Sequence, residues 1–148
     1  MHHLLNLLQR LAGHDLRGQD PITGLCERWR APVECRELAI LASREHILIH
    51  RARELRDATA ADLLQRCDAL RRPERFDQLL EVCRSDAHGR LGHEDDAYPQ
   101  AAYLQTLRDA AAGIDAGAIA KACTDKSRIA EAVQQARIEA IRAAKERL

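Results

Sequence analysis

Residues 85–104, SDAHGRLGHEDDAYPQAAYL, divide an otherwise helical sequence and show where two of its helices meet. Gly89 and Gly92 interrupt the helical pattern, and Pro99 has the fixed φ that suits the first turn of a new helix. The side chains between them are mostly charged or titratable, namely Asp86, His88, Arg90, His93 and Glu94. We interpret the stretch as a polar loop between two helices, in which Asp86 and Glu94 brace the backbone.

Outside this stretch, apolar residues recur at three- and four-residue spacing, which is typical of amphipathic helices. The pattern predicts helices at residues 3–12, from 21 to a stop at 31–32, at 32–53, 59–72, from 73 to the loop, and at 99–112, 115–122 and 126–148. Thr59 resembles the start of a capping box for the fourth of these. No strand-like alternation or hairpin dipeptide occurs. We therefore predict an all-α fold, a helical bundle or array of about seven or eight short helices.

The composition is that of a single domain of 148 residues, or of one domain with a helical tail. The formal net charge is zero, so the overall charge does not favour nucleic acid or membrane as a partner. The five cysteines form no CxxC pair and are best explained as buried free thiols in a reducing compartment. We find no membrane helix or signal peptide and expect a cytoplasmic location.

The predicted helix at 32–53 carries a histidine pair, His46 and His50, on one face. An i,i+4 histidine pair can chelate a metal, but it needs further ligands from elsewhere, and such a pair is more often structural or solvated. Glu45 is expected on the side opposite to the buried stripe. The same region is rich in arginine and forms a basic patch.

Five blocks of the sequence follow one another in a distinctive order: LCERWRAPVECRELAIL at 25–41, the His46 and His50 pair, RPER at 72–75, the stretch at 85–104, and ARIEAI at 136–141. Together they resemble the C-terminal half of bacterial class II CCA-adding enzymes, the tRNA nucleotidyltransferases of the HD-domain type. In that family the fourth block has the form D-x-RGR-x-G-x-E…YPQ. The resemblance runs from about residue 14 to the end of the chain.

On this resemblance we divide the chain into an N-terminal helix of unclear origin at 1–13, a partial HD-like and body region at 14–112, and a helical tail at 113–148. The resemblance implies a tRNA-binding helical portion that holds the acceptor arm and elbow, serving 3′-end maturation or repair. Such contacts recognise RNA by its shape and phosphates. The expected RNA-binding residues are Arg90, His88, Gly89, Arg137 and Arg142, with His88 standing where the family usually has Arg; the alternative for each charged residue is a solvated surface position.

Two features of the family are not apparent in this sequence. No Asp-x-Asp follows a glycine-rich strand, so we expect no nucleotidyltransferase head and assign no catalytic residue. His14-Asp15 resembles the HD doublet, but its spacing to Pro32 better fits a later histidine of the family. The metal-binding set would then be incomplete, with His14, His46 and His50 remaining. We expect no cofactor for this chain alone, although a divalent metal could bind weakly at the remnant HD site.

Whether the chain is an enzyme stays open at this point. One alternative is a remnant HD-type metal-dependent phosphohydrolase that uses His14, Asp15, His46 and His50. Another is a purely structural or oligomerising helical domain with an exposed apolar patch. The expected partners are tRNA and either a separate catalytic head or a second copy of the chain, with no membrane partner.

Overall fold

The computed structural model describes residues 19–89 and 92–148, and this part of the chain is helical without any strand. Its α-helices are α2 (Gln19–Arg28), α3 (Val33–His50), α4 (Asp57–Arg66), α5 (Pro73–His88), α6 (Pro99–Ala112), α7 (Ala116–Ala122) and α8 (Ile129–Lys145). Short 3-10 turns at Ala52–Glu54 and Lys126–Arg128 precede α4 and α8. The all-α prediction is therefore confirmed, whereas the helix predicted at 3–12 lies outside the described residues.

The helix starts predicted at Pro73 and Pro99 agree with the structure, because proline lacks the amide that a first helical turn leaves unpaired. The start predicted at Pro21 was two residues late, since α2 begins at Gln19, and α3 begins at Val33, one residue after Pro32. Pro73 and Pro99 occupy the first turns of α5 and α6. Asp115 caps α7, where its Oδ1 accepts a hydrogen bond from the Ala118 amide at 2.9 Å. The capping box at Thr59 was wrong, since α4 begins two residues earlier, at Asp57.

The end of α4 shows why a helix predicted at 59–72 is shorter in the structure. Asp68 has φ of 52°, and the following amide of Ala69 donates to the Leu64 carbonyl at 2.9 Å. This left-handed ending usually uses glycine, although aspartate tolerates it. The sequence has no glycine at this position to indicate the end of the helix, so the helix predicted from the apolar periodicity extends beyond its observed end at Arg66.

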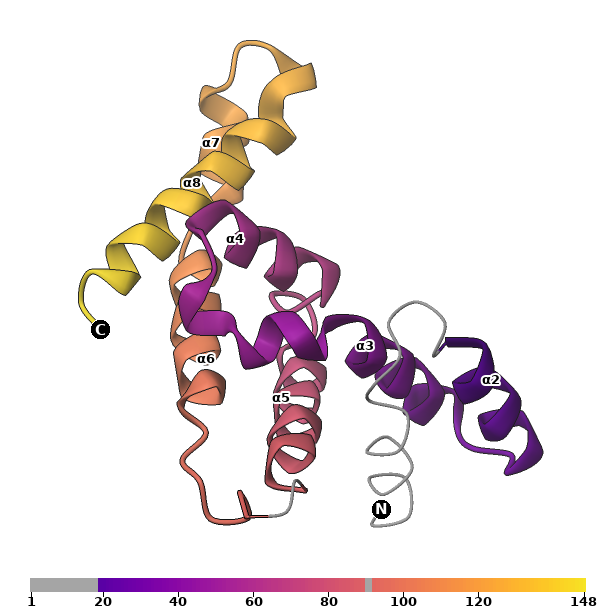
Figure 1. Cartoon of the computed structure of the whole chain (residues 1–148). Coiled ribbons are helices and arrows are strands. Elements are labelled where there is room, and N and C mark those ends of the chain that lie inside the picture. The colour runs from indigo at the N-terminus through magenta and orange to yellow at the C-terminus, as the bar shows by residue number, and fades with distance from the viewer. Residues whose placement is uncertain (1–18, 90–91) are drawn as a thin grey trace.

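One large core joins α3, α4, α5, α6 and α8. Its largest fully buried side chains are Phe76, Ile49, Leu63, Leu64, Leu79, Leu80, Leu104, Leu107, Ile141, Cys67 and Cys83. The apolar stripes predicted for these helices supply this core, which is rich in Leu and Ala because aromatic residues are few. Figure 1 shows α5 and α6 side by side, with the residues at 92–98 that lead into α6 at one end of the molecule.

The two ends of the chain extend from this core in different directions (Figure 1). The α2–α3 hairpin has a second, small core of Ile22, Cys26 and Ala39. At the other end, α7 packs on the first part of α8, while the rest of α8 lies against α4 and α6. The division of the chain at residues 13 and 112 stays a prediction. Within the described ranges, no helix combines the length and apolar character needed to cross a bilayer.

Candidate functional site

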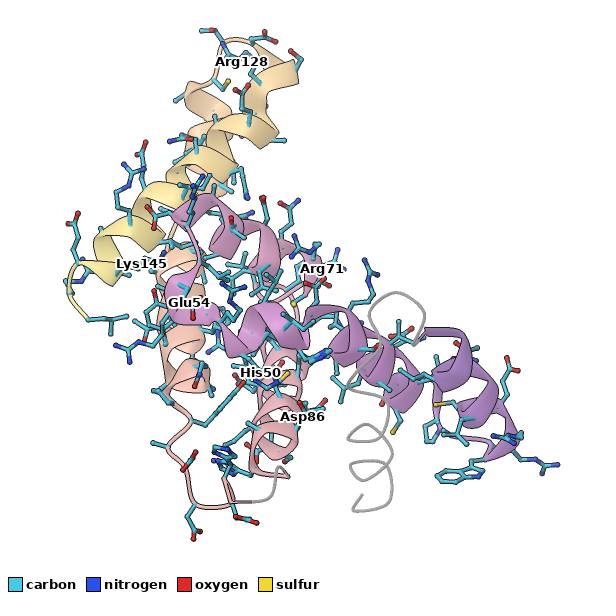
Figure 2. All side chains as sticks on the ribbon, viewed as in Figure 1. His50, Glu54, Arg71, Asp86, Arg128 and Lys145 are labelled. Atoms are coloured by element: carbon cyan, nitrogen blue, oxygen red, sulfur yellow. The ribbon has the colours of Figure 1, made fainter. Side chains whose placement is uncertain are left out.

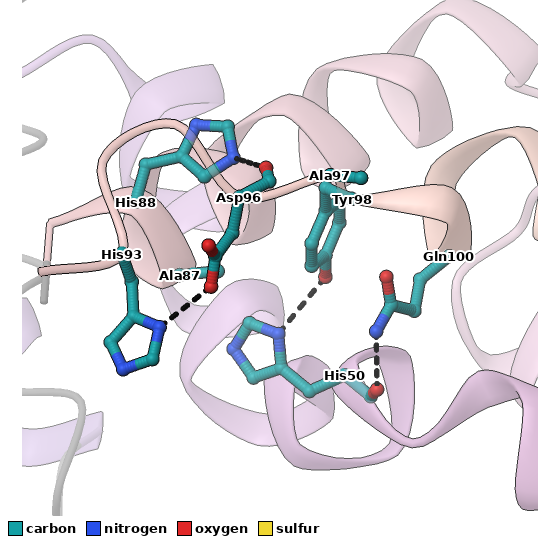
Figure 3. A pocket seen from close by; sticks show the side chains of 8 residues that line it. All are labelled: His50, Ala87, His88, His93, Asp96, Ala97, Tyr98 and Gln100. Carbon is teal, nitrogen blue, oxygen red and sulfur yellow. Dashed lines mark hydrogen bonds and ion pairs between the residues drawn. The ribbon is translucent and has the colours of Figure 1, made fainter.

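A polar hollow of about 260 Å³ lies where the C-terminal end of α3 meets the end of α5 and the start of α6 (Figure 3). The residues that line it come from α3, from the end of α5, from the loop and from α6: His50, Ala87, His88, His93, Asp96, Ala97, Tyr98 and Gln100. Most of the lining belongs to the 85–104 stretch. The structure therefore brings the most distinctive sequence motif against the histidine pair of α3.

His50 is the centre of the contacts that hold this hollow together. Its Nε2 lies 3.0 Å from Oδ2 of Asp86, and its Nδ1 lies 2.9 Å from the hydroxyl of Tyr98. A carboxylate oxygen accepts hydrogen bonds, so Nε2 donates to Asp86, and the tautomer with its proton on Nε2 accepts from Tyr98 at Nδ1. Burial raises the pKa of the Tyr98 phenol well above its usual value, which keeps the hydroxyl protonated as a donor.

Gln100 ties the start of α6 to the end of α3. Its Nε2 donates to the carbonyl of His50 at 3.0 Å. Its Oε1 is buried and accepts no hydrogen bond from the described part of the protein. His50 is thus held by its ring and by its backbone, and the hollow contains one acceptor that the described residues leave unused.

The loop itself is braced by contacts among its own residues. His88 Nε2 donates to the Asp96 carbonyl at 2.8 Å, and His93 Nδ1 lies 2.6 Å from the Asp96 carboxylate. Glu94 accepts from the Gly92 amide at 3.1 Å, and the hydrogen bonds from its own amide and from that of Gly92 lower the pKa of Glu94. Gly92 has φ of 85°, a conformation that favours glycine. The bracing role predicted for Glu94 agrees with its contact to the Gly92 amide, whereas Asp86 bonds His50 on α3.

The expected RNA-binding residues are spread over two regions. His88 and Gly89 end α5 beside the hollow, and Gly89 is exposed, while Arg90 lies outside the described residues. Arg137 and Arg142 are on α8, remote in sequence from the loop. Arg142 is engaged in the fold, because its Nε donates to Asp57 at 3.1 Å. Of these residues, His88 and Gly89 therefore lie beside the loop, whereas Arg142 forms an ion pair with Asp57.

Arg137 differs from Arg142 because one of its side-chain nitrogens has no hydrogen-bond partner among the described residues. It is half-buried on α8, and its Nε is buried without a hydrogen-bond acceptor among the described residues. Figure 2 shows Arg128 at the far end of the tail and Lys145 near the other end of α8, beside Glu54. Arg128 is bonded to Glu131 and Lys145 to Asp57, so several cations of the tail are already paired.

The sequence suggested the histidine pair, His46 and His50, as part of a metal site. The rings of His46 and His50 are in edge-on contact, with centroids 5.9 Å apart, but His46 Nδ1 is bonded to the carbonyls of Ala42 and Ser43. His50 has both nitrogens engaged. Within residues 19–89 and 92–148, no three His, Cys, Asp or Glu side chains gather closely enough to hold a metal ion. The present contacts do not fit a metal, and the set with His14, outside the described residues, stays a prediction.

Sequence reasoning missed a buried ion pair next to this site. Glu45, expected on the solvent side, is 4% exposed and accepts two hydrogen bonds of 3.0 Å from Arg66 on α4. That expectation was wrong because Arg66, the last residue of α4, bonds the flank of α3 that carries Glu45. The available signal was that Leu41 and Ile49 lie one helical turn before and after Glu45, but nothing local indicated its partner.

Comparisons with known proteins found close relatives over nearly the whole chain. No protein-family model and no solved structure matches it. The Multifunctional CCA protein of Laribacter hongkongensis is 55% identical over 142 residues, covering 96% of this chain and 35% of the relative. Those of Cupriavidus metallidurans and Aromatoleum aromaticum are 50% and 47% identical over 92% and 94% of this chain.

These relatives are much longer than the chain, which spans about a third of their length. The resemblance drawn from the five sequence blocks is thus confirmed by identity that extends between the blocks as well. The chain is a homologue of the multifunctional CCA proteins and corresponds to their C-terminal portion.

Proposed function

We propose that this chain is a tRNA-binding helical portion that acts in 3′-end maturation or repair in the cytoplasm. The observation that carries the proposal is the 55% identity, over 96% of the chain, with a Multifunctional CCA protein. The most distinctive block, at 85–104, spans the end of α5, the connection to α6 and the start of α6, and its residues at 92–97 are exposed. RNA backbone can approach this loop closely because Gly89 and Gly92 carry no side chain.

The proposal assigns the RNA contacts to His88, Gly89 and Arg90 at the loop and to Arg137 on α8. Arg142 would contribute by positioning α8 against Asp57, with a smaller direct role than an unpaired arginine. The described side chains around the hollow are engaged in bracing contacts, so the chain alone is proposed to bind tRNA without adding nucleotides. Nucleotidyl transfer is assigned to the part of the relatives that this chain does not match.

The test is binding of the full chain to deacylated tRNA at low and moderate salt, with single-stranded RNA of equal length as the control ligand. The proposal expects preference for tRNA and a steep loss of affinity with salt, because phosphate contacts release counterions. Arg90→Ala should weaken tRNA binding about tenfold and reduce the salt slope by about one. His88→Arg should tighten binding by adding a permanent charge.

The matched control variant is Arg84→Ala. Arg84 is exposed on α5, six residues before Arg90 in the sequence, and is paired with Glu81. Its loss removes the same charge without touching the loop. Equal weakening by Arg84→Ala and Arg90→Ala would reduce the effect to general electrostatics, and absence of any tRNA preference would sink the proposed function.

A further inference from the structure

The α2–α3 hairpin leaves large apolar side chains in solvent. Trp29 and Val33, at the corner between the two helices, are 51% and 58% exposed, and Ile47 near the other end of α3 is 53% exposed. Among the described residues only Leu148, at the chain end, joins them as an exposed large apolar side chain. Three such side chains on one hairpin indicate a surface that is covered in the working protein.

The exposed residues form a line along α3. Val33, Ile40 and Ile47 are spaced by seven residues, which places them on one stripe of the helix. Ile40, in the middle, is half-buried against the small core under α2. Since α2 has ten residues and α3 has eighteen, α2 covers the centre of the stripe and leaves both ends open.

We propose that this stripe, together with Trp29, is the docking face for a polypeptide equivalent to the N-terminal two thirds of the multifunctional CCA proteins. The occupant follows from length and position. The relatives extend well beyond the matched portion, which is their C-terminal part. Their additional chain precedes the segment equivalent to α2, so it enters at this end of the fold, where the core is thin.

The chemistry of the stripe favours a protein over RNA. Trp29 lies between Arg28 and Arg30, which could together stack and pair with an unpaired nucleotide. Val33 and Ile47 lie at the two ends of the stripe. They can contribute to binding energy only by being buried against other apolar groups. The two arginines then form a basic rim that suits acidic side chains at the edge of the partner. This inference does not depend on RNA binding at the loop.

The experiment compares the chain with a full-length chimera, in which it replaces the matched third of the Laribacter hongkongensis protein. Amide hydrogen exchange is measured in both. The expected result is exchange slower by about tenfold or more in α2 and the first half of α3 in the chimera, with α6 unchanged. Val33→Glu with Ile47→Glu should abolish this protection, whereas Leu148→Glu, a matched exposed apolar site at the other end, should not.

Both variants are first checked in the isolated chain, where exposed positions should leave the urea midpoint unchanged. Unaltered exchange in the chimera would overturn the proposal, as would protection that survives the double substitution. Trp29 is the only tryptophan of the chain, so its emission reports directly on other occupants. A concentration-dependent blue shift in the chain alone would replace the proposed partner by a second copy, and quenching by added tRNA would replace it by RNA.

Discussion

His50 and Asp86 join the end of α3 to the last turns of α5 through a hydrogen bond of 3.0 Å, although 36 residues separate them in the sequence (Figure 2). Both side chains are mostly buried, at 19% and 13% exposed. Because Tyr98 bonds the other nitrogen of the ring, the first residues of α6 are drawn into the same contact. The exposed loop is therefore anchored on its inner side by one histidine.

Removing this anchor should destabilise the protein. We expect His50→Ala to lower the free energy of unfolding by about 2 kcal/mol, because Asp86 and Tyr98 lose their partner while remaining largely buried. Tyr98→Phe should cost about 1 kcal/mol. Urea denaturation measures both. The control is His93→Ala, whose ion pair with Asp96 is exposed and should change stability by less than about 0.5 kcal/mol. Equal losses at His50 and His93 would contradict the anchoring role.

The Glu45–Arg66 pair predicts an asymmetric mutational cycle. Arg66→Ala leaves a carboxylate that is 5% exposed without its bidentate partner, and we expect a loss of about 2 kcal/mol. This value lies below that of a fully buried pair because the Arg66 side chain is 40% exposed. Glu45→Leu combined with Arg66→Ala should recover most of the loss. A double-mutant cycle in urea checks this, and simple additivity of the two single changes would refute the coupling.

Asp57 predicts an acid-sensitive contribution from the tail. The hydrogen bond from Lys145, together with that from Arg142, lowers the pKa of Asp57 from its ordinary value of 3.8. A carboxylate with a depressed folded pKa stabilises the fold above its unfolded pKa, and this contribution is lost as pH falls through the folded pKa. Asp57→Asn should therefore cost about 1 kcal/mol at pH 7 and progressively less below about pH 4.

Unfolding by urea at pH 7 and at pH 3 measures this difference. Glu81→Gln is the matched control, since Glu81 forms an exposed pair with Arg84 within α5. A stability difference between Asp57→Asn and the unmodified chain that stays constant over this pH range would show that the ion pairs of α8 do not contribute.

The cysteines should differ in reactivity by burial. Burial raises the pKa of the Cys67 thiol to about 12, and it also raises the pKa of the deeply buried Cys83 and of Cys26. Cys35 and Cys123 are only half-buried. Since the thiolate is the reactive form, native protein should show two rapidly reacting thiols with DTNB and three slow ones. Unfolding in urea should make all five react quickly, and five fast thiols in the native state would contradict this arrangement.

Much of the candidate site could be predicted from sequence because its markers are local. Gly89, Gly92 and Pro99 end one helix and begin the next by backbone restrictions that act within a few residues. The rings of His46 and His50 are in contact, as expected for residues four apart on one face of a helix. The roles of Arg137 and Arg142 were not decided by such rules, because neither the burial of the Arg137 Nε nor the pairing of Arg142 with Asp57 follows from the sequence of α8.

The sequence by itself determined the all-α class, most helix starts and the relationship to the multifunctional CCA proteins, all of which depend on short-range spacing or on residue identity. Only the tertiary structure decided that His50 meets Asp86, that Glu45 is buried against Arg66, and that α8 is fastened to the start of α4. The residues in these contacts are 36, 21 and 85 positions apart in the sequence. The contacts therefore form only after the helices have packed through their apolar faces, which fixes their relative orientation.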